Sequence, residues 1–102
     1  MNGFYFDPKH GGCLRRIRKV NQMTYRIDGV YGSDEIGTHG YWSACARVVR
    51  TSRTSTMLRV DFKGKPSKVD RYLSAEYKHS TRRIHWEDGN VWTKMFTHAT
   101  QL

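Results

Sequence analysis

Hydrophobic and polar side chains alternate along most of this chain with a period of two residues. The clearest case is Thr56–Lys63, where every second side chain from Leu58 to Phe62 is hydrophobic and the residues between and after them are charged. Successive side chains of a β-strand point to opposite faces of the sheet, so this alternation predicts a half-buried strand.

The same pattern predicts strands along most of the remaining chain. They are Gly3–Phe6, Tyr25–Tyr31, Trp42–Val48, Leu73–Lys78, Ile84–Trp86 and Val91–Phe96. Leu14, Ile17 and Val20 are spaced by three, which fits neither a regular strand nor a long helix, and we interpret Leu14–Val20 as a strand with a bulge. Turn-forming Gly, Pro, Asn and Asp residues separate these segments about every dozen residues.

Eight short strands joined mostly by tight turns predict an all-β fold. We expect one antiparallel up-and-down β-barrel over residues 1–96, with a C-terminal tail at 97–102, and a two-layer β-sandwich is the alternative. A chain of 102 residues has room for one hydrophobic core. The predicted inward side chains are bulky, which favours a filled interior over a ligand cavity. They are Tyr25, Tyr31, Trp42, Leu58, Phe62, Leu73, Tyr77 and Trp86.

The last two strands are predicted to form a hairpin around Asp88-Gly89-Asn90. A three-residue loop with a left-handed position would place Glu87 opposite Val91 and Trp86 opposite Trp92, giving an aromatic pair across the two strands.

Charge adds a functional indication to this fold. The formal net charge is +9 at pH 7, which points to an anionic partner. The two cysteines, Cys13 and Cys45, are too few for a disulfide-stabilised secreted domain. No apolar stretch approaches the roughly 20 residues that a membrane-spanning helix needs. We therefore expect a soluble intracellular protein, cytoplasmic or nuclear, with no membrane partner.

Alternate loops of an up-and-down barrel emerge at the same end. In this chain that arrangement would gather many of the basic residues at one end of the barrel. The second, fourth and sixth connections and the residues beside them carry basic side chains interleaved with Ser and Thr and contain no acidic residue. Such an end could position phosphates without reading sequence. The predicted polyanion-binding residues are Arg18, Lys19, Arg50, Arg53, Lys78, Arg82 and Arg83.

The leading hypothesis is therefore a non-catalytic module that docks on nucleic acid or another polyanion. The first alternative is a small-ligand barrel whose cavity would be lined by Tyr25, Tyr31, Trp42, Tyr77 and Trp86. The second is a structural or assembly subunit that uses the basic end against an acidic protein or nucleic acid in a larger complex.

Catalytic and metal chemistry have weaker support. His10-Gly11-Gly12-Cys13 with nearby Asp7 could in principle activate a thiolate, but the glycines and Asp7-Pro8 are typical of a turn. The His and Cys residues do not have the short spacings typical of metal sites, and no nucleotide-binding loop is present. We expect no catalytic residue, no metal and no cofactor.

Three stretches, residues 3–17, 60–65 and 86–94, resemble a family of small eukaryotic β proteins of unassigned function. Residues 3–17 match the pattern G-x-Y-x-D-P-x-H-x-G…R-x-I, and residues 86–94 match W-x-D-G-N-x-W-x-K. The barrel layout is also similar to avidin and lipocalin barrels, by analogy of architecture only. Neither resemblance implies an activity.

Overall fold

The computed structural model describes residues 1–11, 13–33, 38–63 and 71–95. It contains eight β-strands and one three-residue 3-10 helix, η1, at Pro8–His10. The strands are β1 Gly3–Phe6, β2 Arg15–Asn21, β3 Thr24–Ser33, β4 Thr38–Thr51, β5 Ser55–Asp61, β6 Tyr72–Lys78, β7 Arg83–Trp86 and β8 Val91–Lys94. The predicted tail at 97–102 lies outside the described residues.

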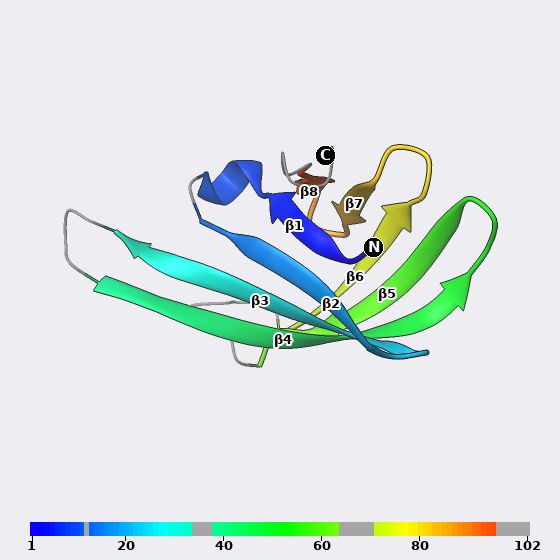
Figure 1. Ribbon diagram of the computed structural model, residues 1–102, viewed down its shortest axis with the longest axis horizontal. Helices are drawn as coiled ribbons and strands as arrows, with labels where there is room; N and C mark the ends of the chain where they lie inside the picture. Colours follow the sequence, from blue (N-terminus) through cyan, green and yellow to red (C-terminus); the bar gives the residue numbers. More distant parts are fainter. Residues whose placement is uncertain (12, 34–37, 64–70, 96–102) are drawn as a thin grey trace, which may run out of the picture.

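The strands form one closed antiparallel barrel in sequence order, so the predicted fold is confirmed. Each strand pairs with the next, and β1 pairs with β8 through Tyr5 opposite Lys94 and Phe6 opposite Thr93. The described connections between strands lie at the two ends of the barrel (Figure 1). Connections β2–β3, β4–β5 and β6–β7 lie at one end, and η1, the last residues of β3 and the first residues of β4 lie at the other. No helix of the described residues is long and apolar enough to cross a membrane.

Every second residue of most strands points into the barrel and is buried, as the alternation predicts. In β5, Thr56, Leu58 and Val60 are buried while Arg59 is exposed. The buried hydrophobic core is Tyr5, Ile17, Ile27, Trp42, Ala44, Ala46, Val48, Leu58, Val60, Phe62, Leu73, Ala75, Tyr77, Ile84, Trp86 and Trp92.

Strand β2 differs from the expectation in which residues face inward. It does contain a register shift, between Lys19 and Asn21, as expected for a bulged strand. However, Leu14 and Val20 are exposed, and the inward positions are Arg15 and Ile17. A guanidinium group occupies a core position here because a buried carboxylate and two indole rings surround it, as described below.

The predicted register of the β7–β8 hairpin is wrong, because the partner of Trp92 lies two residues earlier in the chain than the predicted Trp86. Ile84 is opposite Trp92 and His85 is opposite Val91. The Trp86 N–H donates to the Asn90 carbonyl at 2.9 Å, so the three loop residues are 87–89 rather than 88–90. Gly89, at φ +91°, takes the left-handed position that closes such a loop, and this fixes the register. The rings of Trp86 and Trp92 still pack, with centroids 4.8 Å apart.

Candidate polyanion-binding surface

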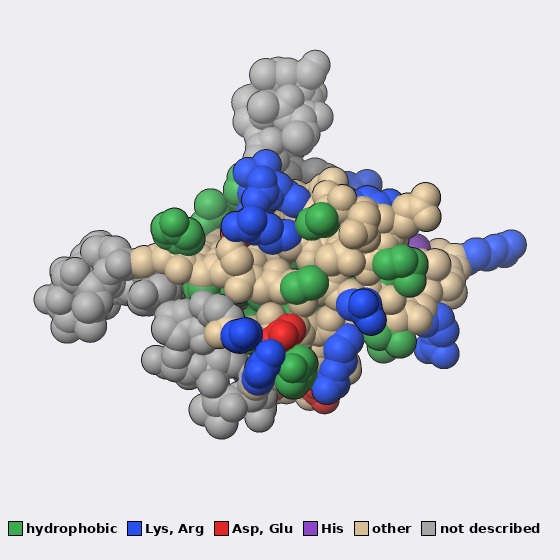
Figure 2. Space-filling model, turned by 90° about the horizontal axis from the view of Figure 1, so that it is seen from below, with side chains coloured by type: hydrophobic (Ala, Val, Ile, Leu, Met, Phe, Trp, Pro, Cys, Tyr) green, Lys and Arg blue, Asp and Glu red, His purple; other side chains and the backbone are tan. Residues whose placement is uncertain are grey.

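The cationic rim is the set of basic residues at or beside the loops β2–β3, β4–β5 and β6–β7. We use the name for Lys19, Arg50, Arg53, Lys78, Arg82 and Arg83, all of which are exposed. In Figure 2, Lys and Arg dominate the visible charged side chains, and several lie at the right-hand end, where these loops lie in Figure 1.

One histidine joins two of the three loops of the rim. The backbone N–H of His79 donates to the Thr54 carbonyl at 3.0 Å. Its ring Nδ1 donates to the Arg53 carbonyl at 3.1 Å, and its Nε2 is hydrogen-bonded to the Thr56 hydroxyl at 2.9 Å. The β4–β5 and β6–β7 loops are therefore held against each other, and the backbone of Arg53 is fixed beside Lys78–Arg83.

Two cations of the rim face each other across adjacent strands. Lys78 of β6 is directly opposite Arg83 of β7. Like charges in this arrangement repel each other. Within the described residues, the side chains of Arg50, Arg53, Lys78 and Arg83 make no ion pair with a carboxylate. No carboxylate of the described part of the chain therefore neutralises their positive charge.

One further cation, Lys94, lies beside the cationic rim and was not predicted from the sequence. The pKa of the Met1 amino group is lowered first by burial and then by the charges of Lys94, Arg82 and Lys19. These three side chains, from β8, the β6–β7 loop and β2, therefore lie close enough to share one electric field. Lys94 was missed because the prediction considered only the connecting loops. Strand β8 runs back beside β7 to this end of the barrel, where the Lys94 N–H donates to the Arg82 carbonyl at 3.0 Å.

Arg18 does not lie free at the rim. It is on the outer face of β2, with Nη2 3.0 Å from Asp28 Oδ2. Arg26 contacts the other oxygen of the same carboxylate at 2.8 Å. Burial alone raises the pKa of Asp28, but hydrogen bonds from Ser43, Arg26 and Arg18 outweigh this and hold the pKa below its usual value. Arg18 is thus already paired within the protein.

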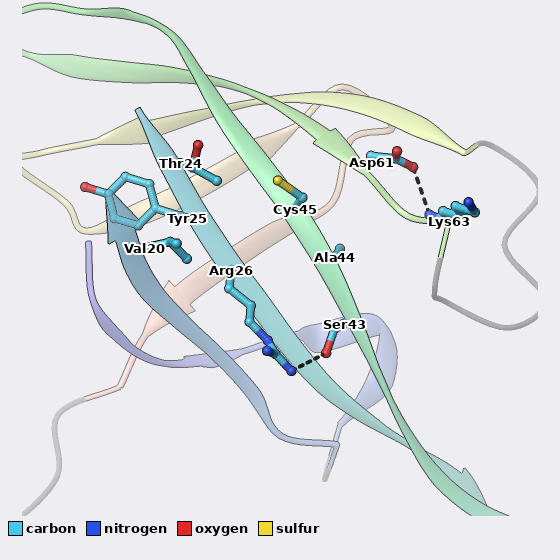
Figure 3. Close-up of a pocket in the computed structure, with 9 residues that line it drawn as sticks. All are labelled: Val20, Thr24, Tyr25, Arg26, Ser43, Ala44, Cys45, Asp61 and Lys63. Atoms are coloured by element: carbon cyan, nitrogen blue, oxygen red, sulfur yellow. Dashed lines mark hydrogen bonds between the residues drawn. The ribbon is translucent and has the colours of Figure 1, made fainter. Parts of the chain in front are cut away.

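A depression lies on the outside of the barrel, over β3 and β4. It has a volume of about 580 Å³ and includes Tyr25, Arg26, Cys45 and Lys63 in its lining. Figure 3 shows Cys45 between the side chains of β3 on one side and Asp61 and Lys63 on the other. Arg26 is bonded to Ser43 there, at 3.0 Å.

The side chains predicted to line an internal cavity mostly fill the core instead. Trp42, Tyr77 and Trp86 are buried, and Phe62 packs on both Trp42 and Trp86, with ring centroids 5.8 and 5.4 Å apart. Tyr25 is half-buried, and the side chain of Tyr31 lies outside the described residues. A cavity of about 60 Å³ remains near Trp86 and Asn90, which is room for about two waters.

The end of the barrel opposite the rim contains a buried ion pair. Asp7 and Arg15 are each 1% exposed, with Asp7 Oδ2 3.4 Å from Arg15 Nη2. Asp7 also accepts hydrogen bonds from the Asn90 side chain, His10 Nδ1 and the Lys9 N–H. Burial alone raises the pKa of Asp7, but these bonds and the charge of Arg15 outweigh it, and the pKa lies below its usual value.

This network gives Asp7 and His10 a structural role at the turn after β1. Asp7 accepts a hydrogen bond from the His10 ring, and the Cys13 backbone N–H donates to the His10 carbonyl at 2.9 Å. Within the described residues the Cys13 thiol makes no hydrogen bond to the His10 ring, so the arrangement of a thiol with its base is incomplete. The described residues also contain no group of three or more His, Cys, Asp or Glu side chains able to hold a metal ion.

Comparison with protein-family models, with curated proteins and with solved structures gives no significant match. The resemblance of the terminal motifs to a family of small eukaryotic proteins therefore stays a prediction.

Proposed function

We propose that this chain is a non-catalytic module that docks on nucleic acid through the cationic rim. The observation that carries the proposal is the unneutralised Lys78–Arg83 pair, held beside Arg53 by His79. Separate cations arranged in this way act on a phosphate backbone as one field, and each phosphate contact releases counterions from the nucleic acid.

The composition of the rim loops supports contact with phosphates rather than reading of bases. Hydroxyl side chains lie between the cations, at Thr51, Ser52, Thr54, Ser80 and Thr81, and can donate hydrogen bonds to phosphate oxygens. The three loops contain no Phe, Tyr or Trp on which an unpaired base could stack. Binding is therefore expected to depend on salt and to vary little with sequence.

The test is a titration of a fluorescently labelled generic oligonucleotide, followed by anisotropy at several salt concentrations. We expect binding at low salt and a linear fall of log K with log salt, with a slope of about −0.9 per phosphate contacted on duplex DNA. Absence of binding at low salt would rule out the proposal.

Matched variants separate the rim from net charge. Lys78→Gln/Arg83→Gln removes two charges at the rim, and Lys9→Gln/Lys63→Gln removes two charges from exposed positions away from it. We expect the first pair to weaken binding at least tenfold and to flatten the salt slope, while the second pair has a much smaller effect. Equal weakening by both would show that only total charge matters.

A further inference from the structure

The outer face of the barrel has two places where arginines stand directly opposite each other on neighbouring strands. Arg18 of β2 is opposite Arg26 of β3. Arg47 of β4 is opposite Arg59 of β5. Directly opposed side chains lie about 4.5–5.5 Å apart at Cβ, and like charges at this spacing destabilise the sheet.

The protein neutralises the first of these pairs with its own carboxylate. Asp28 places Oδ2 3.0 Å from Arg18 Nη2 and Oδ1 2.8 Å from Arg26 Nε. One carboxylate therefore bridges two guanidinium groups, which is the arrangement expected where an anion compensates a repulsive pair.

The second pair has no such bridge among the described residues. Arg59 contacts only neutral partners, with Nη1 3.4 Å from the Ser74 hydroxyl and its guanidinium carbon 5.4 Å from the centre of the Tyr72 ring. Arg47 makes no described hydrogen bond or ion pair through its side chain. Both side chains are exposed.

The acidic groups around the second pair are directed elsewhere. Asp61 is bound by Arg71 through both oxygens, at 3.0 and 3.2 Å. Glu87 accepts a hydrogen bond from the backbone N–H of Ser74 at 2.6 Å. Glu76 is opposite Met57 and makes no ion pair with either arginine in the described part of the chain. The Arg47–Arg59 pair is thus a site of uncompensated positive charge.

We propose that Arg47 and Arg59 together bind a phosphate group. This external anion would compensate their charges in the way that the Asp28 carboxylate compensates those of Arg18 and Arg26. This rests on the proposed function, because the anion is a phosphodiester of the nucleic acid bound at the rim. Arg50 lies three residues after Arg47 on β4, so it extends the cationic rim towards the pair. The bound strand would pass from the β4–β5 loop onto the outer face of β4 and β5.

The experiment compares two double variants that remove the same charge from the same face. Arg47→Gln/Arg59→Gln removes the uncompensated pair, and Arg18→Gln/Arg26→Gln removes the pair already bridged by Asp28. Binding of a labelled oligonucleotide of about 16 nucleotides, the upper end of the site size of a small barrel domain, is measured against salt for each. We expect the first variant to lose at least threefold in affinity and to flatten the salt slope by about 0.7, as one lost phosphate contact on a single strand would. The control should keep the slope of the unsubstituted protein.

Thermal unfolding at low salt without nucleic acid provides the second measurement. Arg47→Gln/Arg59→Gln should unfold at the same temperature as the unsubstituted protein or higher, because it removes a repulsion, whereas a lower midpoint would overturn the assignment. Equal salt slopes for the two variants would also overturn it. Suppose that the unsubstituted protein binds and that Lys78→Gln/Arg83→Gln weakens binding. A lower midpoint or equal salt slopes would then rule out the Arg47–Arg59 site and leave the proposed function intact. Failure of the unsubstituted protein to bind removes both proposals.

Discussion

Arg15 shows how a single side chain can organise one end of a barrel. Its guanidinium carbon lies 5.1 Å from the Trp42 ring centre and 5.7 Å from that of Trp92. Its Nη1 donates to the carbonyls of Leu14 and Val30, and Asp7 faces Nη2. A planar group with several donors suits this place, and the single ammonium of lysine would not reproduce these contacts.

Asp7→Asn is expected to lower the free energy of unfolding at pH 7 by about 3–5 kcal/mol, because it leaves the buried charge of Arg15 unpaired. The pKa of Asp7 is lowered in the folded state, so its contribution is fully present above the unfolded pKa and is lost as pH falls through the folded pKa. Urea unfolding across this pH range should show that the difference in free energy of unfolding between the unsubstituted protein and Asp7→Asn becomes smaller as the pH falls. A difference that stays constant with pH would contradict this account.

Gly29 is fixed by the side chain opposite it. Trp42 is its partner across the ladder, and a Cβ added at Gly29 would overlap two carbons of the indole ring. Trp42 cannot easily move, because it packs on Phe62 and Arg15. Gly29→Ala should therefore destabilise the fold by about 1–3 kcal/mol or more, measured by urea unfolding. Unchanged stability would mean that the indole has room to shift.

At the scale of the elements, the alternation of hydrophobic and polar residues was enough to locate the strands. It was not enough to identify every residue that packs against their inward side chains. Thr56–Lys63 was predictable because its hydrophobic positions form an unbroken period of two. In β2 the period fails, because Arg15 replaces a hydrophobic residue inside and the bulge shifts the register after Lys19. The partners of Arg15 come from residues 7, 42 and 92, which no local pattern connects.

Two glycines allow a controlled test of the hairpin. Gly89 has φ +91° and Gly11 has φ −54°, and in neither case would an added Cβ meet an atom within 4 Å. Only backbone conformation separates the two positions. Gly89→Ala should cost about 1–2 kcal/mol by thermal unfolding. Gly11→Ala should be neutral or slightly stabilising, since it reduces the freedom of the unfolded chain. Equal effects would argue against the left-handed turn.

At the scale of the whole molecule, the barrel is paired unevenly around its circumference. Strands β3 and β4 share ten register pairs, whereas β1 and β8 share two. We expect amides of residues 24–30 and 42–48 to exchange hydrogen most slowly, and those of β1 and β8 to exchange faster, as the closing seam opens first. Hydrogen exchange followed by mass spectrometry measures this order, and uniform protection would show that the barrel opens only as a unit.

The sequence could predict the grouping of the rim loops, because loop order alone determines it in an up-and-down barrel. It could not predict which cations were already neutralised. Arg18 was assigned to the rim, yet it lies opposite Arg26 and beside Asp28, and that depends on the register of β2 against β3. Lys94 lies beside the rim because β8 runs back along β7 to the β6–β7 loop, and the prediction had considered only the loops.

The positions of the two cysteines give the molecule a convenient point of chemical attachment. Cys45 is exposed on β4, two residues before Arg47, whereas Cys13 is only partly accessible. A maleimide dye should therefore react faster at Cys45 than at Cys13. Its emission would then report whether a charged chain travels along the outer wall of the barrel, without any engineered residue.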